Sequence, residues 1–242
     1  MTDSLRTGRP SERRAAARDA VVWDAVLPAI DAGSDVVDVG GGTGGFAVRV
    51  AELGARVTVV DPSPDALAAL GRRAREVGVS VSAQQGDLST LLDVVGPDSA
   101  DMVLCHGVLE VVDDPRAALA TLRTVLRPDG VLSLLVAQRH AAVITRAMAG
   151  HFPQALAMLE SGSGGDGRTG HRFTAPELTE LVTDAGFGVR SVHGIRVFAD
   201  LVPGSLLDLE PGATAALLEL ERAVAERSEY LPLATQLHVL AG

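Results

Sequence analysis

The amino-acid sequence predicts an α/β fold: a Rossmann-like, doubly wound domain with a seven-stranded, mostly parallel sheet. From residue 36 onward, short runs of apolar, often β-branched residues alternate with amphipathic stretches, the pattern of βαβ units. A glycine-rich turn at residues 40–45 separates the first run from the stretch that follows it. The 242 residues, 47% of them hydrophobic, suit one domain with a large core, so we expect 1–242 to be a single domain.

The expected strands follow one another at regular intervals. Residues 36–39 and 57–60 are valine-rich runs that predict two buried strands. The later strands are expected at 79–83, 101–105, 131–136, 187–192 and 237–240. The chain shows no internal repeat, so each strand is assigned from its own run.

Capping residues mark the expected helices. After the second strand, Ser63 can cap a helix, Pro64 suits its first turn and Gly78 can end it. Two further helices are expected, at 115–127, closed by Pro128-Asp129-Gly130, and at 176–185, ended by Gly186.

Three segments lie outside this alternation. Residues 1–33 are expected to form an N-terminal helical cap, and 138–172 and 194–233 are expected to be insertions on the substrate side. Open α/β sheets bind ligands at the carboxyl ends of their strands, which is where both insertions follow. The glycine- and serine-rich residues 161–170 predict either a surface loop or a lid.

The charged residues narrow the possible functions. All 21 basic residues are arginines, which excludes Schiff-base lysines, the phosphate-loop lysine and the Tyr/Lys pair of short-chain dehydrogenases. The net charge of −10 argues against tight non-specific binding of nucleic acid. It leaves room for a local basic patch, and the arginines among residues 6–18 are either a solvated helix face or such an arm.

Cysteine usage and hydropathy exclude other classes. Cys105 is the only cysteine, so we expect neither a disulfide nor a cysteine-rich metal site, and its simplest role is that of a small buried residue. The longest apolar run, residues 131–137, is too short for a transmembrane helix, and the N-terminus lacks the apolar stretch of a secretory signal. We therefore expect a cytoplasmic protein without a membrane partner.

The glycine-rich turn fits two nucleotide-binding patterns. Gly40, Gly42 and Gly45 match the dinucleotide pattern G-x-G-x-x-G, whereas Asp38, Gly40, Gly42 and Gly44 match D-x-G-x-G-x-G. At such a turn the missing side chains let a ligand approach the backbone at a helix N-terminus. Both patterns require an acid after the second strand, and Asp61, 21 residues after Gly40, meets that requirement. The alternative role for Asp61 is that of a helix-capping acid.

Later motifs separate the two patterns. In chain order they are Gly86-Asp87-Leu88, residues 101–110 with Asp114-Pro115, and residues 126–132. With the glycine-rich turn, they resemble the class I S-adenosylmethionine-dependent methyltransferases. A narrower resemblance, to the tRNA 5-carboxymethoxyuridine methyltransferase family, covers most of the chain. It rests on residues 106–110, 130–134, 149–152, 194–200 and 217–221, with His140, Tyr230 and His238-Val239.

The resemblance implies S-adenosyl-L-methionine as the cofactor and assigns roles to individual residues. Arg18 would hold the donor's carboxylate, since a guanidinium can donate two parallel hydrogen bonds, and its alternative is an exposed surface arginine. Asp61 would bind the ribose and Asp87 the adenine edge, with His106 nearby. The full set implied for the cofactor is Arg18, Gly40, Gly41, Gly42, Gly44, Asp61, Pro62, Gly86, Asp87, Leu88 and His106.

The acceptor is the open question. If it is a carboxylate, it is already ionised at neutral pH and needs no general base. Arg196 and His140 are then the candidate catalytic residues, with Arg196 anchoring the carboxylate and His140 orienting it; the alternative for Arg196 is an internal salt bridge to Asp200 or a nearby Glu. If it is a hydroxyl or phenol, His106, His140 or His193 would have to take a proton.

Three alternatives remain for the function. The acceptor is 5-carboxymethoxyuridine in tRNA or, as the acidic net charge favours, a small carboxylic or hydroxylated metabolite. From another class, the glycine-rich turn also suits a nicotinamide-dependent oxidoreductase, against which the missing lysine weighs. A non-catalytic nucleoside-binding protein is the third, because one fold hosts many functions.

Overall fold

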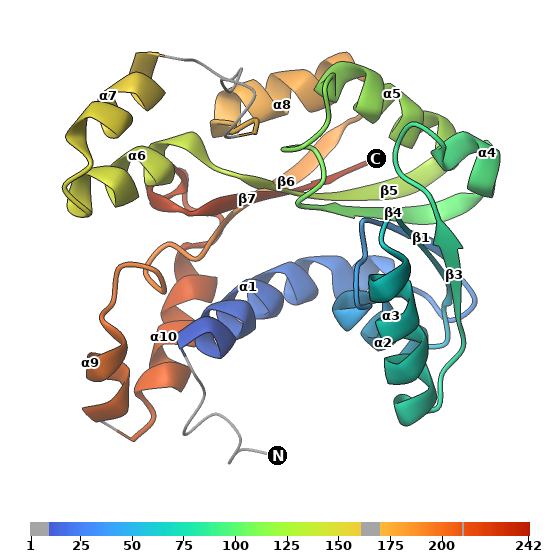
Figure 1. Cartoon of the computed structure of the whole chain (residues 1–242), viewed down its shortest axis with the longest axis horizontal. Coiled ribbons are helices and arrows are strands. Elements are labelled where there is room, and N and C mark those ends of the chain that lie inside the picture. Colours follow the sequence, from blue (N-terminus) through green and yellow to red (C-terminus); the bar gives the residue numbers. More distant parts are fainter. Residues whose placement is uncertain (1–9, 161–169, 210) are drawn as a thin grey trace. The chain divides into compact units, whose positions relative to one another are not determined.

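The computed structural model describes residues 10–160, 170–209 and 211–242. Its main feature is a seven-stranded sheet of order β3-β2-β1-β4-β5-β7-β6 (Figure 1). The strands are β1 (Asp35–Val39), β2 (Arg56–Asp61), β3 (Val81–Gln85), β4 (Ala100–His106), β5 (Leu126–Ala137), β6 (Val189–Ile195) and β7 (Gln236–Ala241). The first five strands pair in parallel. Gly188, directly before β6, and Gly242, directly after β7, exchange both backbone hydrogen bonds, an antiparallel pattern. The predicted fold class is confirmed.

The helices alternate with the strands along the chain. They are α1 (Pro10–Val26), α2 (Gly45–Glu52), α3 (Pro64–Val77), α4 (Leu91–Val95), α5 (Pro115–Val125), α6 (Arg139–Met148), α7 (Phe152–Glu160), α8 (Ala175–Asp184), α9 (Gly204–Leu209) and α10 (Ala213–Val224). Two 3₁₀ turns, η1 (Leu27–Ala29) and η2 (Leu231–Leu233), complete them. None of the described helices is long and apolar enough to cross a bilayer.

The chain divides into two compact units. Unit 1 takes its described residues from Met1–Ala25, Ala137–Glu177 and Ser191–His238, and unit 2 from Val26–Val136, Leu178–Arg190 and Val239–Gly242. The segments that the sequence sets apart, 138–172 and 194–233, thus fall in unit 1. That 1–242 acts as a single domain stays a prediction. The lid at 161–170 falls, except for Gly170, outside the described residues, as do Arg6 and Arg9 of the basic arm.

Unit 2 is built around the central strands. Helices α2 and α3 lie on one face of the sheet, and α4 and α5 lie on the other (Figure 1). Leu70 of α3 and Leu119 and Leu122 of α5 are completely buried. Each contributes about 1.5–3 kcal/mol by the burial of its side chain. This packing makes the carboxyl ends of β1, β2 and β4 a rigid base for the loops that follow them.

The capping prediction for α3 is confirmed. Ser63 Oγ accepts a hydrogen bond from the Ala66 N–H at 3.2 Å, and Pro64 opens the helix. Gly78 ends it with a φ of 83°, a left-handed conformation that costs glycine little. Since β2 ends at Asp61, this cap sets where the carboxylate of Asp61 meets the start of α3.

Three predicted boundaries are wrong because of strand pairing. β5 begins at Leu126 rather than at residue 131, since Ala100 pairs with Leu126 and Met102 with Val131. Pro128-Asp129-Gly130 therefore bulges out of the strand instead of closing a helix, and α5 ends at Val125. β3 begins at Val81, two residues after the predicted start, where it pairs with Val57.

Candidate functional site

The glycine-rich turn after β1 uses the conformational freedom of its glycines. Gly40, Gly42 and Gly44 have φ values of 70°, 54° and 74°, a region that other residues rarely adopt. A Cβ on Gly40 would lie 2.4 Å from Val108 Cγ2, and one on Gly44 would lie 2.1 Å from Leu70 Cδ1. The turn therefore excludes side chains both by its backbone and by close packing. Its own N–H groups serve the fold, because Gly40 donates to the Val60 carbonyl at 2.8 Å and Gly44 to the Gly41 carbonyl at 2.9 Å.

Asp61 joins the glycine-rich turn to α3. Its Oδ2 accepts from the Gly42 N–H and its Oδ1 from the Ser63 N–H, each at 2.9 Å. The side chain is 7% exposed, and each oxygen keeps a further lone pair. Ser63, not Asp61, caps α3, so Asp61 supports the cap residue and its remaining lone pairs are compatible with binding of ribose hydroxyls.

Asp38 lies buried beneath the same turn. A Cβ on Gly41 would lie 2.5 Å from Asp38 Oδ2, so only glycine fits above the carboxyl group. Burial, with a smaller contribution from the neighbouring charge of Asp61, raises the pKa of Asp38 from its usual 3.8 to about 7. The turn therefore rests on an acid that is largely protonated below neutral pH.

We expect this acid to make the stability of the ligand-free protein pH-dependent. Between pH 4 and pH 7 the folded protein keeps the Asp38 proton that the unfolded chain loses, so the free energy of unfolding should fall as pH rises. The slope contributed by one proton is at most about 1.4 kcal/mol per pH unit. Urea denaturation across this range should show that Asp38→Asn removes the slope, whereas Asp31→Asn, at an exposed carboxylate, keeps it. Identical slopes in wild type and Asp38→Asn would contradict the assignment.

Asp87 forms a small capped turn after β3. Its Oδ1 accepts from Ser89 Oγ at 2.6 Å and from the Ser89 N–H at 2.9 Å, and Thr90 adds a longer bond. The Ser89 hydroxyl is the main reason that the pKa of Asp87 is lowered. These bonds hold the carboxylate in its ionised form, suited to accept from an amino group.

His106, the last residue of β4, is held in place by its neighbours. Its Nε2 lies 2.8 Å from Ser133 Oγ on β5, and its ring contacts Phe46 edge to face at 5.3 Å. Ser133 is completely buried, so this partner is fixed. The arrangement fits a positioned side chain at the rim of a pocket better than a freely moving base.

These groups surround a pocket of about 670 Å³ in unit 2. Six of the residues implied by the resemblance line it: Gly40, Asp61, Pro62, Asp87, Leu88 and His106. Gly41, Gly42, Gly44 and Gly86 shape the adjoining turns instead. The volume falls within the range of small-ligand sites, and the lining combines apolar walls with a few carboxylates.

The sequence assigns no role to the residues of the other wall of the pocket. This wall includes Val108, Val111 and Asp113 after β4, with Ala117 and Thr121 of α5. Asp114 caps α5 by accepting from the N–H groups of Arg116 and Ala117. The motif at residues 101–110 with Asp114-Pro115 marks this region in the sequence, but a motif does not show which side chains face the pocket.

The remaining predicted residues belong to unit 1. Arg18 donates to Asp19 Oδ1 through Nε and Nη2, at 2.9 and 2.8 Å, and both side chains are about 40% exposed. His140 is exposed in the first turn of α6. The roles given to Arg18 and His140 stay predictions.

Arg196 follows β6 in an unusual conformation. Its φ is 57°, which is rare for a residue with a side chain. Its Nε lies 3.5 Å from Asp200 Oδ2, and the guanidinium side chain is 21% exposed. The salt bridge considered as the alternative is therefore present, and anchoring of an acceptor stays a prediction.

One candidate base is corrected. His193 is buried, with Nδ1 3.2 Å from His238 Nδ1 and Nε2 3.3 Å from Glu226, and burial lowers its pKa. It is not placed to take a proton from an acceptor. The prediction for Cys105 is confirmed: its thiol is completely buried and its pKa is raised by burial, so it is unreactive. Among the described residues, no group of three or more acidic, His or Cys side chains could hold a metal ion.

Comparisons with known proteins agree with this geometry. Residues 37–134 match the model of a family described as a methyltransferase domain. The tRNA 5-carboxymethoxyuridine methyltransferase of Escherichia coli K12 is 30% identical over 233 residues, covering 93% of this chain and 87% of that protein. A ubiquinone biosynthesis O-methyltransferase of Xanthomonas euvesicatoria is 34% identical over 119 residues, covering 49% of each chain.

Solved structures share the fold. An S-adenosylmethionine-dependent methyltransferase from Mesorhizobium loti superposes with a TM-score of 0.59 at 19% identity, covering 91% of this chain and 97% of that one. The Burkholderia thailandensis 1,6-didemethyltoxoflavin-N1-methyltransferase, determined with bound S-adenosylhomocysteine, gives 0.57 at 22% identity, covering 94% and 78%.

Proposed function

Since this chain belongs to the class I S-adenosylmethionine-dependent methyltransferases, with S-adenosylmethionine as its methyl donor, we propose that it methylates a carboxylate on its acceptor. The proposed acceptor is 5-carboxymethoxyuridine in tRNA. One observation carries this choice: the 30% identity to the Escherichia coli tRNA enzyme extends over 93% of the chain, beyond the shared donor-binding region. Family membership also removes the oxidoreductase and the non-catalytic alternatives.

The pocket of unit 2 fits the donor. Asp61 offers acceptor lone pairs for ribose hydroxyls, and the ionised Asp87 suits the adenine amino group. Gly40 lets the wall of the pocket close tightly, because Val108 packs where its side chain would be. When bound, S-adenosylmethionine supplies a methyl group from its sulfonium. The leaving group is a neutral thioether, so its departure needs no acid.

Two of the three histidines considered as bases are engaged within the fold. His106 has Nε2 at hydrogen-bond distance from Ser133, and both ring nitrogens of His193 have partners, whereas His140 is exposed on α6. A carboxylate titrates near pH 4, so it is ionised at neutral pH and no residue has to remove a proton. Rate enhancement then depends on positioning and on exclusion of water.

Arg196 is the proposed anchor for that carboxylate, with His140 orienting it. A guanidinium can bind a carboxylate through two parallel hydrogen bonds, and Arg196 already pairs with Asp200 at 3.5 Å, so the acceptor carboxylate would share the guanidinium with Asp200. Two carboxylates around one arginine repel each other, which keeps the second one exchangeable. This suits a substrate that must leave as a neutral ester.

A second candidate is a small carboxylic or hydroxylated metabolite. The net charge of −10 is unusual for a protein that binds tRNA, and the similarity to the ubiquinone O-methyltransferase of Xanthomonas euvesicatoria favours a small acceptor. A cytoplasmic site of action stays a prediction for either candidate.

An acceptor panel tests the proposal. We expect turnover on an anticodon stem-loop containing 5-carboxymethoxyuridine and weaker or no turnover on small carboxylic acids and phenols. Because no base has to lose a proton, the rate on the carboxylate should stay constant between pH 6 and pH 8. With a histidine base, the rate would fall as the pH drops below about 6.5, since the base becomes protonated. Activity on phenols alone, with a rate that falls below neutral pH, would contradict carboxylate methylation.

The donor assignment predicts a distinct ligand response. S-adenosylmethionine and S-adenosylhomocysteine should raise the Tm, whereas NAD should leave it unchanged, because Asp61 and Asp87 both line one nucleoside-sized pocket. A ligand at 100 times its Kd stabilises the folded protein by about 2.7 kcal/mol. Differential scanning fluorimetry with the three ligands measures this, and Arg18→Ala should reduce the shift if Arg18 holds the donor's carboxylate.

A further inference from the structure

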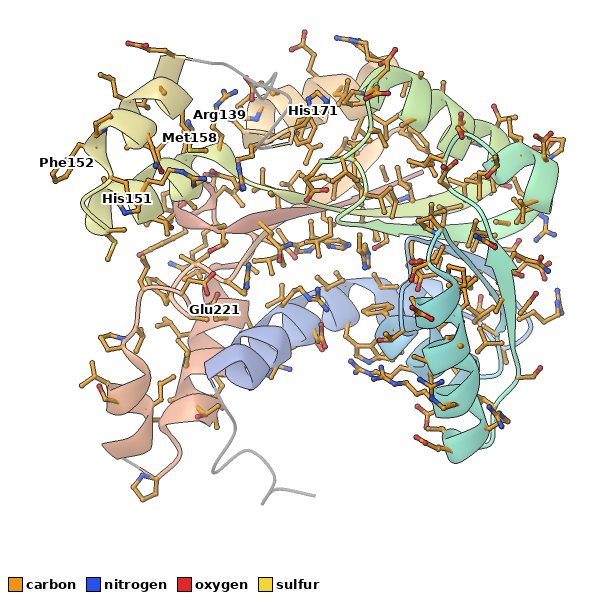
Figure 2. The ribbon with its side chains drawn as sticks, viewed as in Figure 1. Arg139, His151, Phe152, Met158, His171 and Glu221 are labelled. Carbon is orange, nitrogen blue, oxygen red and sulfur yellow. The ribbon has the colours of Figure 1, made fainter. Side chains whose placement is uncertain are left out.

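Glu221 is a completely buried acid whose role the methyl-transfer reaction does not explain. It projects from α10 (Figure 2) and is 0% exposed. Apolar side chains surround this part of unit 1, with Val197, Val224 and Ala234 forming one buried cluster. Burial of a carboxylate is strongly unfavourable unless hydrogen-bond donors pair with it.

Three consecutive backbone N–H groups donate hydrogen bonds to this carboxylate. Val197 donates to Oε2 at 2.8 Å, and Phe198 and Ala199 donate to Oε1 at 2.9 and 2.7 Å. Successive N–H groups converge on one anion only when the chain turns out of regular strand geometry. The side chain of α10 therefore fixes the backbone that directly follows Arg196.

The conformation of Arg196 depends on that turn. Its φ of 57° is a strained conformation that persists only where the surroundings impose it. On the other side of the residue, Thr235 Oγ1 lies 3.2 Å from the Arg196 carbonyl and 2.7 Å from Asp200 Oδ2. The backbone of Arg196 and its partner Asp200 are thus held from two directions.

The helix that carries Glu221 is itself anchored within unit 1. Arg222 donates to Asp24 of α1 at 2.7 Å, and Leu217 packs in a buried cluster with Ala17 and Ala199. The Gly194 N–H donates to the Ala225 carbonyl at 2.6 Å, which ties the end of α10 to β6. The position of the Glu221 carboxylate is therefore set by a rigid framework.

We propose that Glu221 is a positioning residue for acceptor recognition: by gathering the three N–H groups after Arg196, it sets the direction of the guanidinium that binds the acceptor carboxylate. The inference rests on the proposed function, because it takes Arg196 as the anchor. A purely structural role for Glu221 predicts a different outcome, in which every ligand loses affinity together or only the Tm falls.

The experiment compares binding of 5-carboxymethoxyuridine with that of its methyl ester in the presence of S-adenosylhomocysteine. Glu221→Gln keeps the size of the side chain but turns an amide N–H₂ toward one of the three donors. We expect Glu221→Gln to lower the affinity for the carboxylate about tenfold, the effect of weakening one charge-assisted contact, with the ester and S-adenosylhomocysteine affinities unchanged. Glu219→Gln, an exposed acid on the same helix, is the matched control and should change none of the three.

Thr235→Val supplies a second variant in case Glu221→Gln does not fold. It removes the hydroxyl contacts to Asp200 and to the Arg196 carbonyl and should lower the carboxylate affinity selectively in the same way. Equal losses for carboxylate and ester in both variants would overturn the positioning role. If the wild type itself binds the ester as well as the carboxylate, the proposed acceptor is wrong, which is a separate result from a failure of Glu221.

Discussion

Replacement of Gly40 by valine should abolish donor binding. Gly40 has a φ of 70°, and a Cβ there would lie 2.4 Å from Val108 Cγ2, so the variant forces a strained backbone and a clash at the wall of the pocket. Strain and overpacking each cost about 1–3 kcal/mol. These costs fall on the folded protein, which relieves them by displacing the turn and Val108 from the wall of the pocket, and this displacement should lower the affinity for S-adenosylhomocysteine by more than about 100-fold. Isothermal titration calorimetry measures the loss.

Gly71 provides the matched glycine control. It lies within α3, where a Cβ would meet nothing within 4 Å. Gly71→Ala should leave the donor affinity unchanged and raise the free energy of unfolding by about 0.4–1 kcal/mol, because alanine restricts the unfolded chain. Unchanged donor affinity in Gly40→Val would show that the donor does not approach this turn.

Arg196→Gln should lose most turnover on a carboxylate acceptor while it keeps its affinity for the donor. The substitution keeps a polar side chain but shortens it and removes the positive charge that binds the acceptor carboxylate. A hydrogen bond to a charged group contributes about 1.5–3 kcal/mol, which corresponds to a loss of roughly 10- to 150-fold in kcat/KM. Initial rates with saturating S-adenosylmethionine give this ratio.

The control for Arg196 is Arg227→Gln, at an exposed arginine of the same unit. It should keep full turnover. That result would exclude a general loss of positive charge as the cause of the effect of Arg196→Gln. Full turnover in Arg196→Gln would instead confine Arg196 to its salt bridge with Asp200. The anchor for the acceptor would then have to be sought elsewhere.

Local sequence signals predicted the parts of the site that depend on local chemistry. The glycine-rich turn, Asp61 and the Ser63 cap are read from neighbouring residues, because backbone freedom and helix capping act over a few positions. Asp61 also shows the limit of such reasoning. The sequence offers capping of α3 or ligand binding as its role, whereas Ser63 is the cap and the Asp61 carboxylate holds the Ser63 N–H while it lines the pocket.

Long-range pairing explains what the sequence could not provide. The start of β5 at Leu126 is set by Ala100 on β4, and the bulge that follows has the composition of a turn. Glu221 reads as one more acid on an amphipathic helix, and only the fold brings it to the turn after Arg196. Val108 packs against Gly40 although the two residues are 68 positions apart, so no local sequence pattern predicts their contact.

Transfer of an isotopically labelled methyl group to the acceptor tests the central claim most directly. The full-length protein is incubated with S-adenosylmethionine carrying a deuterated methyl group and an RNA stem-loop containing 5-carboxymethoxyuridine, and the nucleosides are analysed by mass spectrometry. We expect 5-carboxymethoxyuridine to gain one labelled methyl group that mild alkali removes, because the product is an ester. Absence of the label from the nucleoside, or a label that survives alkali, would contradict methylation of its carboxylate.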